Sequence, residues 1–585
     1  MEAATTTQRP AAEQSVSSFA KSLFLGEIHE ELVFPFPMPS DDEQEKVRRL
    51  IASLREYAGE AYDARRFEEE AWIPEEVIAG LGERGLMGLY VPEEYGGQGL
   101  SQTGYCRVSE VFGQIDGTLA VVMGVHQSIG MKGIALFGTE EQKQRFLPDL
   151  ASGRKMAAFA LTEPEAGSDV HGLRSRAVRQ PDGSWLLNGE KRYIGNGSRA
   201  DVLVTFARCE VDGEDSHIAL ILESGMDGFE VGERFDTMGL RANDLRPLYY
   251  RDVRVPPENV LGEAGEGFKI AMHVLNNGRM SLGTGSVGAT KVFLDLVIDH
   301  VKERRQFDRP LSDFELVQDK VGWMVSYLFG LEAMTYLTTG LVDRGVPDYS
   351  LESAIVKVAG TEFLWYAANR AMQLKGGAGY MRDEPYEKAL RDIRIFPIFE
   401  GANDVMRAFI ALSGMKPLGD ELREVGGIDL GRPIGAIGVL ADYVTSRVKR
   451  EVMPDRVTMA HDAISELAAP LTDQVKRLRG VTESLLRAHR KGIIERQFHQ
   501  KRLADAVADI YAQIAVLSRV TAHLEDNDVE ISGQELYIAE TFCTRAAKRV
   551  EYQLDQIEQN DDDRMVAIAK LALKRGEYGY AFFED

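Results

Sequence analysis

Residues 389–406, ALRDIRIFPIFEGANDVM, form the stretch that decides how this chain is interpreted. Glu400 lies between the almost wholly apolar IFPIF and Gly401. A carboxylate held against an apolar wall has a raised pKa and can act as a general base, and glycine lets the backbone approach a ligand closely. The alternative is an acid that caps the helix which GANDVM would open. Spacing alone favours this capping role.

The hydrophobic pattern changes twice before this stretch. Apolar residues recur at helical spacing from Ser40 to about residue 155. Hairpin signals follow, PDG at 181–183 and NG at 188–189. Three runs then have the length and the β-branched or aromatic composition of strands: VLVTFARC (202–209), HIALILE (217–223) and LYYRDVRV (248–255). Helical patterning returns at Gly267.

The pattern predicts a mainly α-helical protein with a central β-domain. Five parts are expected: an N-terminal tail (1–39), an N-terminal α-domain (40–155), a middle β-domain (156–265), a C-terminal α-bundle with the candidate base (266–420) and an additional α-helical domain (430–585). The start of the tail is polar and rich in small residues, which is typical of disorder. The Gly- and Pro-rich GRPIGAIG at 431–438 indicates the last boundary.

Composition excludes several classes of function. A net charge of −24 over 585 residues argues against general nucleic-acid binding, which needs a basic face. The three cysteines lie far apart and offer no disulfide framework, so a reducing compartment is expected. The ten histidines show no ligand spacing, so no metal site is expected. No apolar run approaches the roughly 18 residues of a membrane span.

Five further segments suit ligand binding, and each has a plainer alternative. FALTEPEAGSD (159–169) and QLKGGAGYM (373–381) have small residues where backbone can approach a ligand, or they are simple loops. KRYIGNG (191–197) contains a turn signal. ERRQFDRPLSDF (303–314) is basic and aromatic, as many solvated helix ends are. LNNGRMSLGTGSVG (275–288) contains a formal GxGxxG, but helical patterning without a βαβ unit argues against a dinucleotide fingerprint.

Together these segments and Glu400 resemble the acyl-CoA dehydrogenase family over most of residues 20–415. The chain is most similar to the very-long-chain branch, whose extra C-terminal region it shares. The resemblance implies an FAD enzyme that converts long-chain acyl-CoA to trans-2-enoyl-CoA, with electron-transfer flavoprotein as the acceptor. Glu400 would remove the α-proton. In one branch of the family the acid comes from the helix at 275–288, where this chain has Gly278.

The resemblance also assigns binding residues. It places FAD against Phe159, Leu161, Thr162, Ser168, Tyr193, Ile194, Gly195, Ala402 and Asp404. It places a second subunit's FAD against Arg304, Gln306, Phe307, Phe314, Gln373, Gly376 and Gly377, which implies a homodimer. It places the acyl-CoA near Ser168, Asn276, Arg279 and Gly401.

One departure from the family pattern concerns the electron acceptor. The family usually has Thr or Ser at the position of Gly195, where the hydroxyl hydrogen-bonds the flavin near N5. Acyl-CoA oxidases resemble this chain in having glycine there. The alternatives are therefore an acyl-CoA oxidase that passes electrons to O2, or an assembly protein that reuses the same fold.

Two segments bear on membrane contact and on the location of the protein: residues 475–502 and the N-terminus. Residues 475–502 carry nine Lys or Arg against two Glu, interleaved with apolar residues. Such a segment can lie on an anionic membrane or pack on the body with a solvated basic face, and the resemblance favours peripheral membrane contact. The N-terminus has no apolar signal core and one Arg, so a secretory signal is excluded. A bacterial cytoplasmic protein is expected, whereas a eukaryotic one would be mitochondrial.

Overall fold

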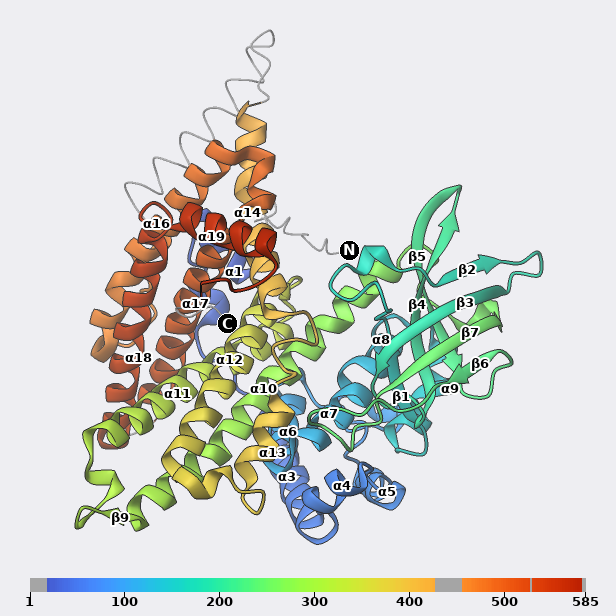
Figure 1. The fold of residues 1–585 in the computed structure, drawn as a ribbon, viewed down its shortest axis with the longest axis horizontal. Coiled ribbons are helices and arrows are strands. Elements are labelled where there is room, and N and C mark those ends of the chain that lie inside the picture. The colour runs from blue at the N-terminus through green and yellow to red at the C-terminus, as the bar shows by residue number, and fades with distance from the viewer. Residues whose placement is uncertain (1–17, 427–454, 527–528, 581–585) are drawn as a thin grey trace, which may run out of the picture.

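The computed structural model describes residues 18–426, 455–526 and 529–580 of the chain. Figure 1 shows the central sheet on one side of a bundle of long helices and the C-terminal helices on the opposite side. The expected class, mainly α with a central β-domain, is confirmed. The boundary expected at 431–438 lies outside the described residues.

The N-terminal part is helical up to the first strand. Its elements are α1 (Phe19–Leu25), α2 (Glu30–Val33), α3 (Asp41–Ala61), α4 (Ala64–Glu70), α5 (Glu75–Glu83), α6 (Gln102–Ile115), α7 (Gly117–Gly124), the π-helical η2 (Val125–Gly130), α8 (Lys132–Phe137) and α9 (Glu140–Ala151). Polar side chains cap several of them: Thr139 forms a capping box at α9, and Asp116 caps α7.

The prediction of a tail over 1–39 is wrong for residues 18–39. Phe19 on α1 is fully buried. The hydroxyl of Ser18 caps α1 by accepting from a backbone N–H, and it donates to Glu352 Oε1 over 2.9 Å. The apolar residues of this short segment pack on helices more than 300 positions away, which local composition does not reveal.

Residues Gly117–Phe137 correct a second expectation. They are long and apolar enough to span a membrane, with a mean hydropathy of 1.3 over 18 residues. Because 67% of that window is buried, the segment is a core helix of the fold.

The middle part is one mixed sheet. Its strands are β1 (Met156–Ala160), β2 (Arg176–Arg179), β3 (Trp185–Ile194), β4 (Ala200–Val211), β5 (Glu214–Glu223), β6 (Phe229–Val231), β7 (Arg246–Val255) and β8 (Val260–Leu261). The order is β6-β7-β3-β2-β4-β5-β8, with β1 parallel to β4. The PDG turn at 181–183 joins β2 to β3, as predicted. The NG at 188–189 instead lies inside β3, where the register with β7 shifts.

Long helices follow the sheet and carry the candidate base. They are α10 (Gly267–Glu303), α11 (Glu315–Asp343), α12 (Ser350–Lys375), α13 (Pro385–Ile393) and α14 (Asn403–Gly426), with the short strands β9 (Arg305–Gln306) and β10 (Arg309–Pro310) and the turn η6 (Gly376–Tyr380) between them. GTGSVG lies in the middle of α10, so the rejection of a dinucleotide fingerprint agrees with the structure.

The C-terminal part packs on this bundle. It consists of α16 (Ser465–His489), η8 (Arg490–Glu495), α17 (Gln497–Asp526), α18 (Val529–Asp555) and α19 (Asp562–Arg575). In the segment 475–502, Leu478 and Leu485 are buried because α16 packs against α1, α17 and α18. Ile494 and Phe498 are exposed. Over most of the segment, the structure favours a helix packed on the body with a solvated basic face.

Candidate active site

Glu400 lies in the loop between α13 and α14, with its carboxylate inside the protein. Its Oε2 atom is buried and has no hydrogen-bond partner. Burial raises the pKa of Glu400 to about 7, although Arg279 and Lys357 lower it. Helix α14 begins only at Asn403, and this unpartnered oxygen does not satisfy a helix N–H. Glu400 therefore does not cap helix α14, which was the alternative role.

The backbone at Glu400 adopts an unusual conformation. Its φ is +57°, and that of Gly401 is +92°. A left-handed conformation is uncommon for a residue with a side chain and requires support from its surroundings. The buried Lys357 of α12 provides support, because its Nζ donates to the Gly401 carbonyl and to Asn403 Oδ1, each over 2.7 Å.

Helix α10 forms the wall facing the carboxylate. A Cβ added at Gly278 would lie 2.8 Å from Glu400 Oε2, so glycine is required for the carboxylate to occupy this place. Arg279 is buried and donates to Asn276 Oδ1 over 2.8 Å, and its Nε points to the Glu400 carbonyl at 3.4 Å. Burial lowers the pKa of Arg279 to about 10. The structure thus brings three of the expected substrate-site residues, Asn276, Arg279 and Gly401, to Glu400.

An apolar cavity extends away from Glu400. Its lining on α10 runs from Gly278 to Leu296, roughly 27 Å of helix. The opposite walls come from α6, α7, η2, α13 and the loop after α13, and they include Val121, Ile129, Ile393, Phe396 and Phe399. A long apolar chain placed in this cavity would have one end beside the carboxylate.

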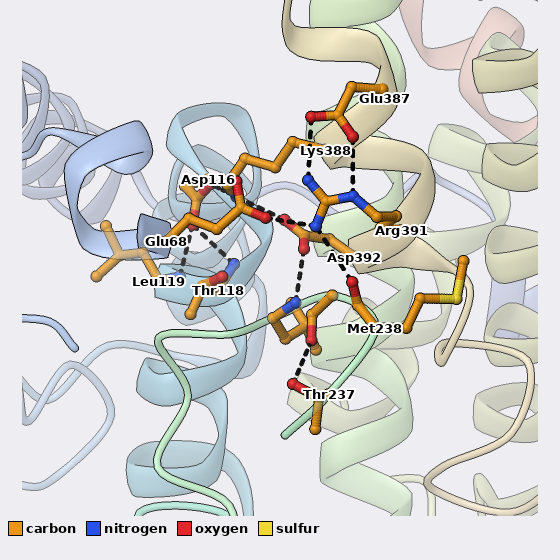
Figure 2. Close-up of polar contacts among 12 residues, drawn as sticks. Glu68, Asp116, Thr118, Leu119, Thr237, Met238, Glu387, Lys388, Arg391 and Asp392 are labelled. Carbon is orange, nitrogen blue, oxygen red and sulfur yellow. Dashed lines mark hydrogen bonds and ion pairs between the residues drawn. The ribbon is translucent and has the colours of Figure 1, made fainter. Parts of the chain in front are cut away.

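Three of the lining residues, Asp116, Lys388 and Asp392, belong to a polar cluster, which Figure 2 shows. Lys388 donates to Asp116 Oδ2 and to Asp392 Oδ2, each over 2.6 Å. Asp392 Oδ1 accepts the backbone N–H of Leu240 over 2.6 Å. The cluster joins the start of α7, helix α13 and the loop before β7, so it holds two walls of the cavity, α7 and α13, against each other.

The two expected flavin segments lie side by side. The buried Lys191 donates to the Leu161 carbonyl over 3.0 Å and to Glu163 Oε1 over 2.7 Å. The Arg192 N–H donates to the Thr162 carbonyl over 2.8 Å. Burial lowers the pKa of Lys191 to about 8. These contacts hold the end of β1 against the end of β3.

Polar groups beside Gly195 suit a bound flavin. A Cβ at Gly195 would lie 3.1 Å from Val125 Cγ2, whose residue lines the cavity, and 3.6 Å from Asn243 Oδ1. The Oδ1 atoms of Asn243 and Asn196 are buried without partners. A flavin carries N–H and O–H groups that such oxygens can accept. Phe159, Leu161 and Ile194 are buried nearby in β1, the loop after it and β3, whereas Ser168 and Tyr193 are exposed.

Another set of expected cofactor residues lies far from Glu400 within this chain. One group follows the C-terminus of α10: Arg304, Gln306, Phe307 and Phe314. The other group lies at the end of α12, with Gln373 in its last turn and Gly376 and Gly377 just after it. About 38 Å of helix separates Gly278 from the end of α10. Phe307 is 88% exposed, and its ring meets that of Phe314 with centroids 6.2 Å apart. Ala402 and Asp404 instead lie in and just after the Glu400 loop.

Several residues of this site were not predicted. Four of them, Lys357, Asn403, Lys191 and Glu163, act through contacts between distant segments, and Asn243 has a buried oxygen without a partner. One signal was available: a single lysine interrupts the otherwise apolar AIVKVAG in α12, and an isolated charge within a buried helix requires a partner.

The site therefore has the features of an enzyme active site: a buried carboxylate with a raised pKa at one end of an apolar cavity. Family models match four successive parts of the chain. They are the acyl-CoA dehydrogenase N-terminal domain over 41–154, its middle domain over 158–253, its C-terminal domain over 265–415, and the ACAD9/ACADV C-terminal domain over 462–578.

Known proteins of this kind match almost the whole chain. The human mitochondrial very long-chain specific acyl-CoA dehydrogenase is 36% identical over 98% of this chain and 90% of its own length. The probable acyl-CoA dehydrogenase FadE10 of Mycobacterium tuberculosis is 33% identical over 96% and 89%. The crystal structure of an acyl-CoA dehydrogenase complexed with FAD from Bacillus anthracis superposes with a TM-score of 0.80, 28% identity and 94% coverage of both chains.

The chain belongs to the acyl-CoA dehydrogenase family and carries the additional C-terminal domain. It is a flavoenzyme of acyl-CoA dehydrogenation, with FAD as its cofactor.

Proposed function

We propose that the protein oxidises long-chain acyl-CoA to trans-2-enoyl-CoA in fatty-acid β-oxidation. One observation carries this proposal: the unpartnered carboxylate of Glu400 lies at one end of a long apolar cavity. FAD, when bound, supplies the acceptor for the β-hydrogen. The chain's own residues hold the base, orient the acyl group and exclude water.

Glu400 is the proposed base. Its pKa, raised to about 7, makes it a stronger proton acceptor than an ordinary carboxylate and leaves a useful fraction ionised at neutral pH. Removal of the α-proton leaves an electron pair that the thioester carbonyl takes up as an enolate, and donors near that oxygen stabilise it. We assign the Glu400 backbone N–H to this role, as the resemblance implies. Closure of the cavity around the acyl chain keeps water from the carboxylate.

The preference for long chains rests on the small residues of the cavity wall. A Cβ at Gly285, on the α10 wall, meets nothing within 4 Å, and one at Gly117 comes no closer than 3.6 Å to another atom. Gly285 therefore leaves room for substrate, whereas a Cβ at Gly117 would be in van der Waals contact with Asp392 and Leu240. The test compares kcat/KM for butyryl-, octanoyl- and palmitoyl-CoA in the wild type and in Gly285→Leu. A wild-type preference for palmitoyl-CoA that Gly285→Leu shifts to shorter chains is expected; a wild-type preference for butyryl-CoA contradicts the proposal.

A second candidate, an acyl-CoA oxidase, is favoured by one observation. Gly195 has no hydroxyl to donate to a flavin, and glycine at this position is the feature that the chain shares with the acyl-CoA oxidases. Peroxide formed in amounts equal to the substrate consumed would identify the oxidase. Slow reoxidation in air and fast reoxidation by electron-transfer flavoprotein would identify the dehydrogenase that we prefer.

A homodimer completes the proposed site. The side chains of Phe307 and Tyr380 are 88% and 75% exposed. Their segments follow the C-terminal ends of α10 and α12, far from the Glu400 of the same chain. In the proposed dimer they contact the FAD of the partner subunit, where arginine can pair two phosphate oxygens.

We also propose a location for the protein and a contact with the membrane. A reducing compartment, the bacterial cytoplasm or the mitochondrial matrix, is compatible with three free, buried cysteines. Peripheral contact with an anionic membrane through 475–502 would have to use Ile494 and Phe498, next to exposed Arg490 and Lys491. Loss of vesicle binding in an Ile494→Asp variant is the measurement that tests it.

A further inference from the structure

We propose that the C-terminal α-domain positions the catalytic loop through a chain of side-chain contacts. This positioning chain consists of Asp505, Arg407, Glu362, Asn403 and Lys357. It starts on α17 and ends at the carbonyl next to Glu400. The inference deepens the proposed function and rests on Glu400 being the base.

The first link holds the loop itself. Lys357 Nζ donates to the Gly401 carbonyl and to Asn403 Oδ1. Both Glu400 and Gly401 have left-handed backbone, and the carboxylate of Glu400 has an unpartnered oxygen. The place of this carboxylate therefore depends on the backbone contacts around it.

The second link passes from the loop to α12 and α14. Asn403 Nδ2 donates to Glu362 Oε1 over 3.2 Å. Glu362 in turn accepts both ends of the Arg407 guanidinium, over 2.6 and 2.8 Å. A bidentate pair of this kind fixes the orientation of both side chains.

The third link reaches the C-terminal domain. Arg407 Nε donates to Asp505 Oδ1 over 2.7 Å, and Lys501 holds the other oxygen of Asp505 over 2.6 Å. Arg407, Glu362 and Asp505 line a cavity between α12, α14, α17 and α18. The Arg407 side chain is only 12% exposed, so loss of Asp505 would leave its cation partly uncompensated.

A neighbouring ion pair holds the C-terminal domain on the helix bundle without contacting the Glu400 loop. Asp509 lies one helical turn beyond Asp505 on the same cavity and pairs with Arg549 of α18. Arg549 also contacts Tyr327 of α11. This pair joins helices but leads to no residue of the Glu400 loop, so Asp509 is the matched control for Asp505.

The experiment measures the anaerobic rate of flavin reduction by saturating palmitoyl-CoA, with KM, bound FAD and melting temperature. In Asp505→Ala the rate is expected to fall about tenfold, because a small displacement of a catalytic group is costly, while KM and FAD content stay near wild type. Asp505→Asn keeps an oxygen that can accept from Arg407 and is expected to recover most of the rate. Asp509→Ala is expected to lower the melting temperature but not the rate.

Equal rate losses in Asp505→Ala and Asp509→Ala, or a full rate in Asp505→Ala, would overturn the proposal. If Asp505→Ala does not fold, Glu362→Gln tests the same chain from the dehydrogenase side, and an unchanged rate there would equally overturn it. Failure of the proposed function itself is distinguishable, because the wild type would then not be reduced by palmitoyl-CoA.

Discussion

Gly278 and Glu400 occupy adjoining space: a Cβ at Gly278 would lie 2.8 Å from Glu400 Oε2 and as close to Ile129 Cγ2. Gly278→Ala is therefore expected to displace the carboxylate and to reduce turnover about tenfold or more. Gly322→Ala on α11 is the control, since its Cβ would enter open space outside the cavity lining. Steady-state kinetics of both variants check this, and equal activities would show that Gly278 does not protect the base.

The pH dependence of kcat/KM should report the buried base. Below a pKa of about 7 the Glu400 carboxyl is protonated and cannot accept a proton. We expect kcat/KM to rise about tenfold per pH unit below this value and to level off above it. Burial also lowers the pKa of nearby Lys357 to about 7, so the apparent pKa belongs to the pair. A profile that stays flat down to the ordinary pKa of glutamate would contradict this.

Protein stability should show the same ionisation. The pKa of Glu400 is higher in the folded than in the unfolded chain, so its contribution is complete below the unfolded value and is lost as pH rises through about 7. Glu400→Gln removes this loss. Its melting temperature, relative to the wild type, is expected to be higher at alkaline than at acidic pH. A difference that does not change with pH would mean that burial has not shifted this group.

The buried pair Lys191–Glu163 should support both flavin segments. Lys191→Met leaves the Glu163 carboxylate buried without its cation, which is expected to destabilise the fold by about 3–5 kcal/mol and to weaken FAD retention. Arg251→Met is the control, because its pair with Glu230 is exposed on both sides and is worth about 1 kcal/mol or less. Denaturant unfolding and the ratio of flavin to protein measure the two effects; equal effects of the two variants would argue against this role.

The homodimer should depend on the exposed segment around Phe307. Phe307→Asp is expected to yield monomers that have lost FAD, since a charge would be buried in the proposed interface. Leu573→Asp on α19, at a side chain that is 82% exposed, serves as the control. Analytical ultracentrifugation and flavin content test this, and an FAD-loaded Phe307→Asp dimer would exclude the proposed interface.

Local pattern was sufficient for the fold class. The strand runs and the surrounding helical spacing predicted the central sheet, because each depends on near neighbours in sequence. The resemblance, rather than spacing, selected Glu400 as a base over a helix cap.

Features that depend on distant contacts could not be predicted in this way. Residues 18–39 appeared to be a tail because their partners, such as Glu352, lie far along the chain. The NG at 188–189 gave a turn signal but lies within a strand, where pairing with β7 overrides local preference. Lys357 acquires its role only when α12 packs beside the Glu400 loop.

The most direct test of the account is anaerobic addition of palmitoyl-CoA to the FAD-loaded wild type and to Glu400→Gln. The wild-type flavin band should bleach, and the variant should keep its FAD yet bleach about 10²- to 10⁴-fold more slowly. A variant that bleaches at the wild-type rate would contradict the central claim that the buried carboxylate of Glu400 removes the α-proton.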